Sequence, residues 1–517
     1  MWVVAFMQAF CYGVTATLNP YVYSEFSMHS LLALTGVIST LIAGLFKFPY
    51  AKLIDIWGRA QGFFLMIVFN TLGLIMMAIC TNVQTYCAAQ VFYWIGYYGI
   101  DFSITIFIAD TSALKNRAFW LGYSSSPFLI TTWVTGPAAS TILAPGGIGI
   151  KWGFGVFCIV MPFALSPLAI IFYRNQKKAE RMGVIHRPSS DRSFWESCLY
   201  YCKEFDVIGL LILATGLALF LLAFNLYSYQ KNTWRAPMII CFLIFGGLSI
   251  ITFVIWEKYF APVTFMPWEL IKNRTVVTTY TMAASLYMSW YIWDNYFYSL
   301  LIVVFNLSVT HATYVSNIYT IGSCFWALVM GVVIRYNGRL KWWALYFGAP
   351  LTILAVGLMI KFRQPDSNIG YIIMCQIFIA FGGGALVICE QMTVMAVSKQ
   401  ENIPAIIAME SSIISIGSAI GSTIAEAMWT GIFPVKLLQL LPESSKDQFS
   451  SIYGSIDVQI SYDPGSPVRD AIDHAYGDTQ RVMLITATCL YSITLVSILF
   501  WKDINVKDIK QIHGRHF

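Results

Sequence analysis

One carboxylate stands inside an aromatic stretch of the sequence, where Asp294 lies among tyrosines and tryptophans. If this stretch is helical, Tyr287, Tyr291 and Tyr298 share the face of the carboxylate, because the four positions fall at i, i+4, i+7 and i+11. A charge at bilayer depth costs at least about 2.5–3.5 kcal/mol, so such a residue normally faces a cavity or a partner. We expect Asp294 to carry a proton or contact a ligand; a structural bond to a neighbouring helix is the alternative.

Two further acids lie in apolar stretches. Asp101 follows Trp94 and Tyr98 at helical spacing, which makes a second polar and aromatic stripe. Glu390 follows the run Gly382–Gly384, which permits close backbone approach or local unwinding. A low-dielectric surrounding favours the neutral form of a carboxyl group, so buried acids can exchange protons near neutral pH. Asp294, Asp101 and Glu390 are therefore the proton-coupling candidates, although Asp101 could bind a ligand and Glu390 could make a packing hydrogen bond.

Aromatic residues supply the candidate walls of a binding site. Tryptophan and tyrosine belts at both interfaces are common in membrane proteins, so residues near the ends of spans are assigned to belts. The deeper aromatic residues are predicted to contact a substrate, and they are Tyr98, Trp133, Trp290, Tyr291 and Tyr298.

Charged residues near the ends of predicted spans are candidates for a gate. Asp55 and Arg59 are expected to lock two spans to their neighbours in one conformation. Asp110 is close in sequence to Arg117, which predicts an ion pair or gate there. Lys47 is flanked by apolar residues, so we expect its ammonium to extend to the interface; pairing with a buried acid is the alternative.

The composition identifies the class of protein. The 517 residues are 58% hydrophobic and 11% charged, with mean hydropathy +0.66, whereas soluble domains carry about 25% charged residues. The chain is therefore predicted to be a polytopic, all-α membrane protein in a lipid bilayer. Basic residues spread among short loops give no basis for nucleic-acid binding. Neither a metal quartet nor a nucleophile–base pair is evident, so we expect no enzyme, no metal and no cofactor.

About fourteen apolar windows are long enough to span a bilayer. They lie near 1–18, 30–50, 62–80, 87–110, 118–142, 153–173, 207–228, 236–256, 276–304, 312–334, 342–360, 370–396, 404–432 and 482–501. Basic residues are concentrated in the loops on the side of the termini, so the positive-inside rule places both termini in the cytoplasm. The chain opens directly in an apolar window, so we expect either that an N-terminal tail precedes it or that none exists.

An internal repeat divides the chain. Ala51–Arg59 after the second window corresponds to Gly331–Arg339 after the tenth, and Gln90–Gly96 corresponds to Gln376–Gly382. Parallel six-helix repeats around a midplane site are the arrangement of the major facilitators. The predicted organisation is a six-helix bundle at 1–173, a cytoplasmic loop at 174–206, an inserted helix pair at 207–258, and a second six-helix bundle at 276–517 with a long outer loop at 434–480.

Several short runs carry a more specific resemblance. Ala51–Arg59 resembles the loop motif of major facilitator transporters, departing at Ala51 and Ile56. The other runs are Glu25–Ser30, Lys47–Lys52, Ile106–Ser112, Lys272–Thr275, Leu307–Thr310, Gly465–Ile472 and Ala475–Gly477. Together they resemble the fungal siderophore-iron transporters, a fourteen-span branch of the major facilitators. The cytoplasmic N-terminal tail usual in that family is absent from this sequence.

The resemblance implies proton-coupled import of a ferric siderophore of hydroxamate type, such as ferrichrome, by alternating access. A monomer in the plasma membrane or in endosomal vesicles is expected. In the outer loop, substrate capture or lid formation is expected of Tyr462, Arg469, His474 and Tyr476; a solvated loop over the mouth is the alternative. A drug:proton antiporter of the same fold, and a receptor built on that fold, remain alternative functions.

Overall fold

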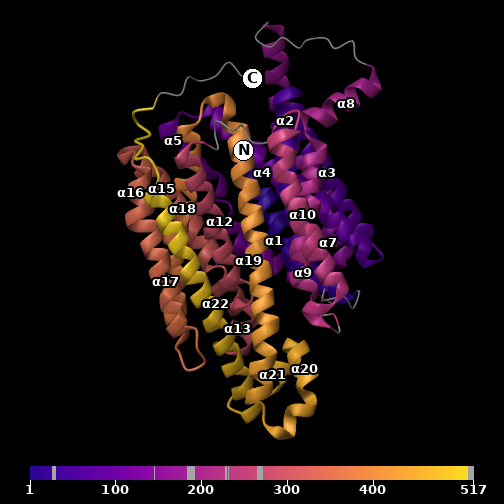
Figure 1. Cartoon of the computed structure of the whole chain (residues 1–517), viewed down its shortest axis with the longest axis vertical. Helices are drawn as coiled ribbons and strands as arrows, with labels where there is room; N and C mark the ends of the chain where they lie inside the picture. Colours follow the sequence, from indigo (N-terminus) through magenta and orange to yellow (C-terminus); the bar gives the residue numbers. More distant parts are fainter. Residues whose placement is uncertain are drawn as a thin grey trace.

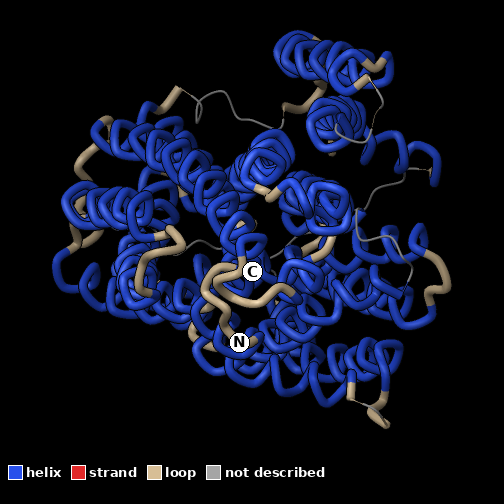
Figure 2. Tube along the Cα trace, turned by 90° about the horizontal axis from the view of Figure 1, so that it is seen from below, coloured by secondary structure: helices blue, strands red, loops and turns tan. Residues whose placement is uncertain are grey.

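The computed structural model describes residues 1–25, 31–144, 146–182, 193–227, 230, 232–264 and 272–509, and the chain is almost entirely helical over these ranges (Figure 1). Viewed along its length, the molecule shows most of its helices close to end-on, with no strand in the described part (Figure 2). The run Glu25–Ser30 and the basic loop residues Arg187 and Arg192 fall wholly or partly outside the described residues.

The first group of helices follows the apolar windows of the first third of the chain. It comprises α1 (Trp2–Glu25), α2 (Leu31–Ile56), α3 (Arg59–Ile79), α4 (Val83–Thr111), α5 (Leu114–Ser125), α6 (Phe128–Leu143) and α7 (Gly149–Arg181). Helices α3, α4 and α7 pack on one another, as do α1 and α6. The predicted fifth span is broken between α5 and α6, because Pro127 has no N–H to continue the ladder of helical hydrogen bonds.

A short helix and a helix pair follow. The short helix is α8 (Phe194–Glu204); after it come α9 (Val207–Leu226), η2 (Thr233–Arg235) and α10 (Pro237–Tyr259). α9 and α10 pack side by side, and α9 also contacts α2 and α19. Many apolar side chains of this pair point away from the protein, such as Leu211 and Phe245, which are 59% and 60% exposed. Such a surface is suited to lipid contact.

The second group of helices contains the remaining windows. It comprises α12 (Arg274–Asp294), α13 (Phe297–Val303), α14 (Val309–Ser316), α15 (Ile318–Asn337), α16 (Leu340–Trp343), η3 (Ala344–Gly348), α17 (Ala349–Phe362), α18 (Ile369–Val397), η4 (Gln400–Asn402), α19 (Ile403–Leu440), η5 (Glu443–Gln448), α20 (Phe449–Gly454), α21 (Ile456–Ser461) and α22 (Pro467–Leu499). α12 packs on α19 and α22, and α18 packs on α15 and α17.

The most extensive contacts between the two groups are those of α2 with α19 and of α5 with α15. α1 begins and α22 ends at one end of the molecule, which we call the terminal end; α20 and α21 lie at the opposite, distal end (Figure 1). Ten helices of the described residues are long and apolar enough to cross a membrane. The domain boundaries drawn from the sequence stay a prediction.

The repeat seen in the sequence has a counterpart in the packing. Gly96 on α4 and Gly382 on α18 occupy corresponding positions of the repeat. A Cβ on Gly96 would lie 2.3 Å from the backbone N of Asn70 on α3, and one on Gly382 would lie 2.4 Å from Oγ1 of Thr352 on α17. Both glycines therefore permit the same close approach of neighbouring helices.

The segment at 434–480 differs from the long loop expected from the sequence. α19 continues to Leu440 and α22 starts at Pro467, with η5, α20 and α21 between them. Pro467 stands in the first turn of α22, where no N–H is needed, and the side chain of Ser466 caps that turn by accepting from the N–H of Arg469. The segment is therefore a compact helical cap at the distal end.

Candidate functional site

The larger of two cavities between the groups lies in the distal half of the molecule. It has a volume of about 730 Å³ and is lined from α1, α6, α13, α14 and α15. Trp133 and Tyr314 face each other across the two groups, with ring centroids 5.0 Å apart. Tyr298 also lines it, together with hydroxyl groups such as those of Thr17 and Thr313. No charged side chain belongs to the described lining of this distal cavity.

A smaller inner cavity of about 270 Å³ lies between α4, α5, α12, α15 and α18. Asp101 opens into it and is exposed there although it lies deep among the helices. Trp290 lines the same cavity and stacks on Tyr319 at 5.7 Å. The Nε1 donor of Trp290 is buried with no acceptor among the described residues. A ligand with an acceptor group would satisfy it.

The predicted aromatic residues fall into two sets. Trp133 and Tyr298 line the distal cavity, and Trp290 lines the inner cavity. Tyr98 and Tyr291 line neither cavity. Tyr98 stacks on Trp94 at 5.4 Å, and Tyr291 lies edge-on to Trp290 at 4.7 Å. Tyr291 therefore supports Trp290 at the inner cavity, whereas Tyr98 packs on Trp94, which lines neither cavity.

Asp294 is the last residue of α12 and is half-buried. It interacts electrostatically with the guanidinium of Arg363, and it makes no hydrogen bond within the described structure. The single face expected for Tyr287, Tyr291, Asp294 and Tyr298 does not form, because the helix breaks at Asn295 and Tyr296. Tyr298 instead belongs to α13.

Arg363 explains why the helix breaks between α12 and α13. It was not predicted as a site residue, because its place in the sequence is that of an ordinary loop arginine. It is fully buried and donates from Nη1 to the carbonyl of Trp293 at 2.7 Å and to Oε1 of Gln480 at 3.0 Å. Its guanidinium also lies 4.1 Å from the ring centroid of Phe297. The arginine thus satisfies a carbonyl that a continuous helix would bond internally.

Lys47 corrects one expectation from the sequence. Its side chain does not extend to the interface: the residue is 8% exposed, and its ammonium lies 4.6 Å from the ring centroid of Tyr98. The ammonium interacts electrostatically with Asp101 of α4 and Glu410 of α19. The alternative, a lysine beside a buried acid, is the arrangement found, and that acid is Glu410.

Two glutamates are sealed inside the second group. Glu390 of α18 is 0% exposed and Glu410 of α19 is 2% exposed. Both carboxyl oxygens of Glu390 and Oε1 of Glu410 have no hydrogen-bond partner in the described residues. Their carboxyl groups interact with each other. Because an isolated buried carboxylate is strongly unfavourable, this pair is suited to holding a proton.

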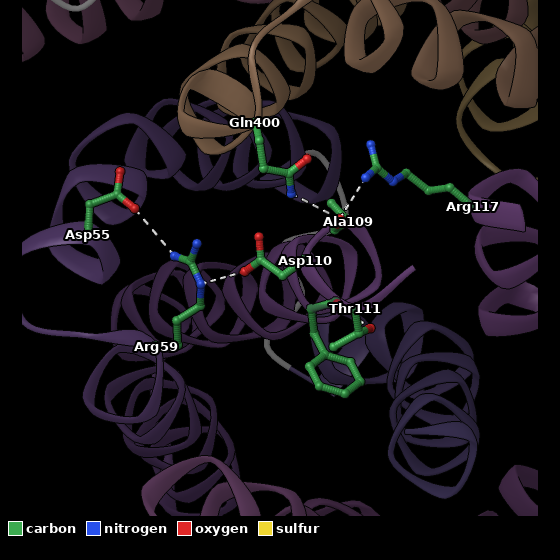
Figure 3. A network of polar contacts seen from close by, with 8 residues as sticks. Asp55, Arg59, Ala109, Asp110, Thr111, Arg117 and Gln400 are labelled. Atoms are coloured by element: carbon green, nitrogen blue, oxygen red, sulfur yellow. Dashed lines mark hydrogen bonds and ion pairs between the residues drawn. The ribbon is translucent and has the colours of Figure 1, made fainter. Parts of the chain in front are cut away.

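A network of polar contacts lies at the terminal end (Figure 3). Arg59 donates from Nε to Asp110 Oδ2 at 2.7 Å and from Nη1 to Asp55 Oδ1 at 3.3 Å. The buried Arg117 donates from Nη2 to the carbonyl of Ala109 at 2.6 Å. Gln400, from the second group, donates from Nε2 to the same carbonyl at 3.1 Å. The four charged residues predicted as a gate are therefore gathered where the two groups touch.

The residues predicted in the outer loop lie in the distal cap and line neither cavity. Arg469 is 1% exposed and donates to the carbonyls of Gln459 and Val303, with Asp473 Oδ1 3.4 Å from its Nε. The hydroxyl groups of Tyr476 and Tyr462 bond to Gln459 and Gln448, and His474 is exposed. Arg469 and Tyr476 hold the cap together; the part these four residues play in capture stays a prediction.

Comparison with known proteins gives consistent results. The family model described as Major Facilitator Superfamily matches residues 1–422. The chain is 52% identical to the MFS siderochrome iron transporter 1 of Ajellomyces capsulatus, over 99% of this chain and 87% of that protein. It is 38% identical to the siderophore iron transporter mirB of Emericella nidulans, over 100% of this chain and 85% of that protein.

Among solved structures, the human organic anion transporter MFSD10 has a TM-score of 0.56 at 11% identity, over 95% of this chain and 97% of that one. This likeness supports the fold alone. The family match and the near full-length relatives go further, because they place the chain among transporters and not among enzymes. The chain therefore belongs to the siderophore iron transporter family of the major facilitator superfamily.

Proposed function

We propose that this protein imports ferric siderophores of the hydroxamate type, driven by the proton gradient. The observation that carries the proposal is the distal cavity, of about 730 Å³, with aromatic walls, hydroxyl groups and no charged side chain in its described lining. A ferric trihydroxamate is bulky, near neutral and coordinatively saturated, so it needs apolar walls and a few hydrogen-bond groups and no metal ligands. The volume falls in the range of about 300–1,000 Å³ usual for small-molecule sites. The names of the relatives point to the same cargo.

The proposed orientation follows from the charge distribution and the gate. Basic residues are concentrated in the loops at the terminal end, so we assign that end to the cytoplasm, in the plasma membrane. With this assignment, the network of Arg59, Asp110 and Gln400 closes the cytoplasmic side, while the distal cavity reaches the outer ends of α6 and α14. The conformation is then the outward-facing state of an alternating-access cycle.

Protons are proposed to bias that cycle through the interior acids. Asp101 opens into the inner cavity and Asp294 is half-buried, whereas Glu390 is sealed. A proton taken up on the outer side neutralises a buried charge, and its release to the cytoplasm restores it. A single protein copy contains both cavities and the gate, so a monomer suffices for this cycle.

The direct test is uptake of radio-iron-labelled ferrichrome by iron-starved cells that lack their own siderophore carriers, with and without a protonophore. We expect accumulation that the protonophore abolishes. If a chain shown to reach the cell surface takes up neither ferrichrome nor other hydroxamate chelates, import is refuted. Efflux of preloaded organic compounds in the same cells would then identify an exporter.

A further inference from the structure

Four interior charged residues interact with one another across the two groups. Lys47 is on α2, Asp101 on α4, Glu390 on α18 and Glu410 on α19, each in the terminal half of its helix. The first two belong to the first group and the last two to the second group. Three of the four are buried, and Asp101 opens into the inner cavity. The cluster thus spans the surface on which the two groups must separate if the terminal end opens.

Lys47 contacts side chains of the first group, to which it belongs, and faces the second group. On the α4 side, its ammonium lies over Tyr98 at 4.6 Å and interacts with Asp101. On the opposite side it interacts with Glu410. In the described part of the chain, no carboxylate oxygen lies within ion-pair distance of the Lys47 ammonium. The buried ammonium of Lys47 therefore interacts with two acids. Asp101 belongs to its own group and moves with it, whereas Glu410 belongs to the second group and does not.

The helices that carry Lys47 and Glu410 touch directly. Ser412 Oγ of α19 donates to the carbonyl of Gly44 of α2 at 2.8 Å. A Cβ added to Gly44 would lie 2.3 Å from the side chain of Ser415. The contact is less than one helical turn from each charge. Any movement that separates α2 from α19 must therefore also draw Lys47 away from Glu410.

The groups around Glu410 leave Lys47 as its cationic neighbour. From α12, Tyr280 and Tyr287 face Glu410, and from α18 Glu390 does so. Glu390 in turn faces Tyr287, Tyr319 and Cys389. Around Lys47 the ionisable groups are Tyr98, Asp101 and Glu410. A negative charge on the Glu390–Glu410 pair is thus stabilised by Lys47 across the interface, and a proton on the pair removes that attraction.

We propose that Lys47 and Glu410 form an electrostatic latch between α2 and α19, which holds the terminal end closed until the Glu390–Glu410 pair takes up a proton. Lys47 is a positioning residue in this scheme and contacts no cargo. The inference rests on the proposed proton-coupled import and adds the element through which the proton acts. It names Glu410 as the acid that Lys47 faces across the two groups, where the sequence predicted only that Lys47 could pair with a buried acid.

The test is a double-mutant cycle of Lys47→Met, Glu410→Gln and the combined variant, measured as uptake of ferric ferrichrome against external pH and normalised to protein at the cell surface. Each single change leaves a buried charge without its partner, so we expect uptake to fall within the range of about 5- to 150-fold typical of coupled sites. The double variant removes both members of the Lys47–Glu410 pair, so neither is left without the other, and uptake should partly recover with a flattened pH profile. Lys47→Arg should stay near wild type, and the exposed Lys361→Met serves as the matched control.

Two results would overturn the latch. One is a Lys47→Met variant with the uptake and the pH profile of wild type. The other is a double variant whose loss equals the product of the two single losses, which would mean that the residues act independently. If Lys47→Met does not reach the surface, the isosteric Glu410→Gln decides, because an unchanged pH profile refutes the proposal. A wild-type protein without protonophore-sensitive uptake refutes the proposed function instead, so the two failures are distinguishable.

Discussion

At the scale of single residues, the interior acids differ in what surrounds them. Asp101 opens into a cavity, Asp294 is half-buried near Arg363, and Glu390 is enclosed without a donor among the described residues. An accessible acid exchanges protons readily, whereas an enclosed one needs a conformational change or a neighbour to do so. We therefore propose that Asp294 and Asp101 take up protons from outside, and that protonation of the two glutamates releases the closed terminal end.

Replacing Asp294 with asparagine keeps the size of the side chain and removes its charge. We expect Asp294→Asn to bind ferric ferrichrome at the cell surface but to lose at least about tenfold of protonophore-sensitive accumulation, within the usual range of coupling between sites. Binding at low temperature and uptake at growth temperature separate the two effects. The exposed Asp366→Asn is the control. Accumulation that survives in Asp294→Asn would exclude this acid as the proton carrier.

Arg363 should contribute strongly to stability. Arg363→Ala would remove hydrogen bonds to Trp293 and Gln480 and leave both acceptors buried, at a cost of about 1–3 kcal/mol each. We expect a lower Tm of the detergent-purified protein, measured by tryptophan fluorescence, whereas the exposed Arg481→Ala should leave it unchanged. Equal Tm values for the two variants would contradict a structural role for Arg363.

At the scale of elements, the helices were predictable and their breaks were only partly so. Runs of apolar residues lead to helices in a bilayer whatever their neighbours are, and Pro127 explains the break between α5 and α6. The break between α12 and α13 has no proline or glycine, and it depends on Arg363, which is distant in sequence. Lys47 was misplaced for a related reason: its burial depends on Tyr98, Asp101 and Glu410, which come from two other helices. Local patterns carry no information about such partners.

The distal cap gives an element-scale prediction. Arg469 connects α22 to the carbonyl of Val303 at the end of α13 and to α21 through Gln459. We expect Arg469→Gln to loosen η5, α20 and α21, so that protease added outside the cell cleaves within 441–466 faster than in wild type. The exposed Arg481→Gln is the control. Loss of ferrichrome binding with an unchanged cleavage rate would show instead that Arg469 contacts cargo.

At the scale of the whole molecule, the two groups of helices are joined by short-range polar contacts at the terminal end. Arg59 bonds to Asp110 within the first group, and Gln400 of the second group bonds across to the carbonyl of Ala109. Because each contact contributes modestly, their sum can be offset by cargo binding and a proton. Such a balance is required of a transporter, since a terminal end that is too stable would stop the cycle.

Weakening this network should shift the population towards the state that is open at the terminal end. The native Cys324, which lines the inner cavity between the two groups, reports this opening, in a background in which Cys198 and the exposed Cys202, Cys241 and Cys489 are replaced by serine.

We expect Asp110→Asn to speed maleimide labelling of that cysteine in inside-out vesicles more than Asp55→Asn does. The reason is that the Arg59–Asp110 contact is 2.7 Å and mostly buried, whereas the Arg59–Asp55 contact is 3.3 Å and half-exposed. Equal labelling rates in both variants and wild type would mean that the network does not hold the terminal end closed. Faster labelling with Asp55→Asn alone would assign the closure to the outer, more exposed pair. The expected order links one ion pair to the conformation of the entire protein, because only separation of the two groups admits the reagent.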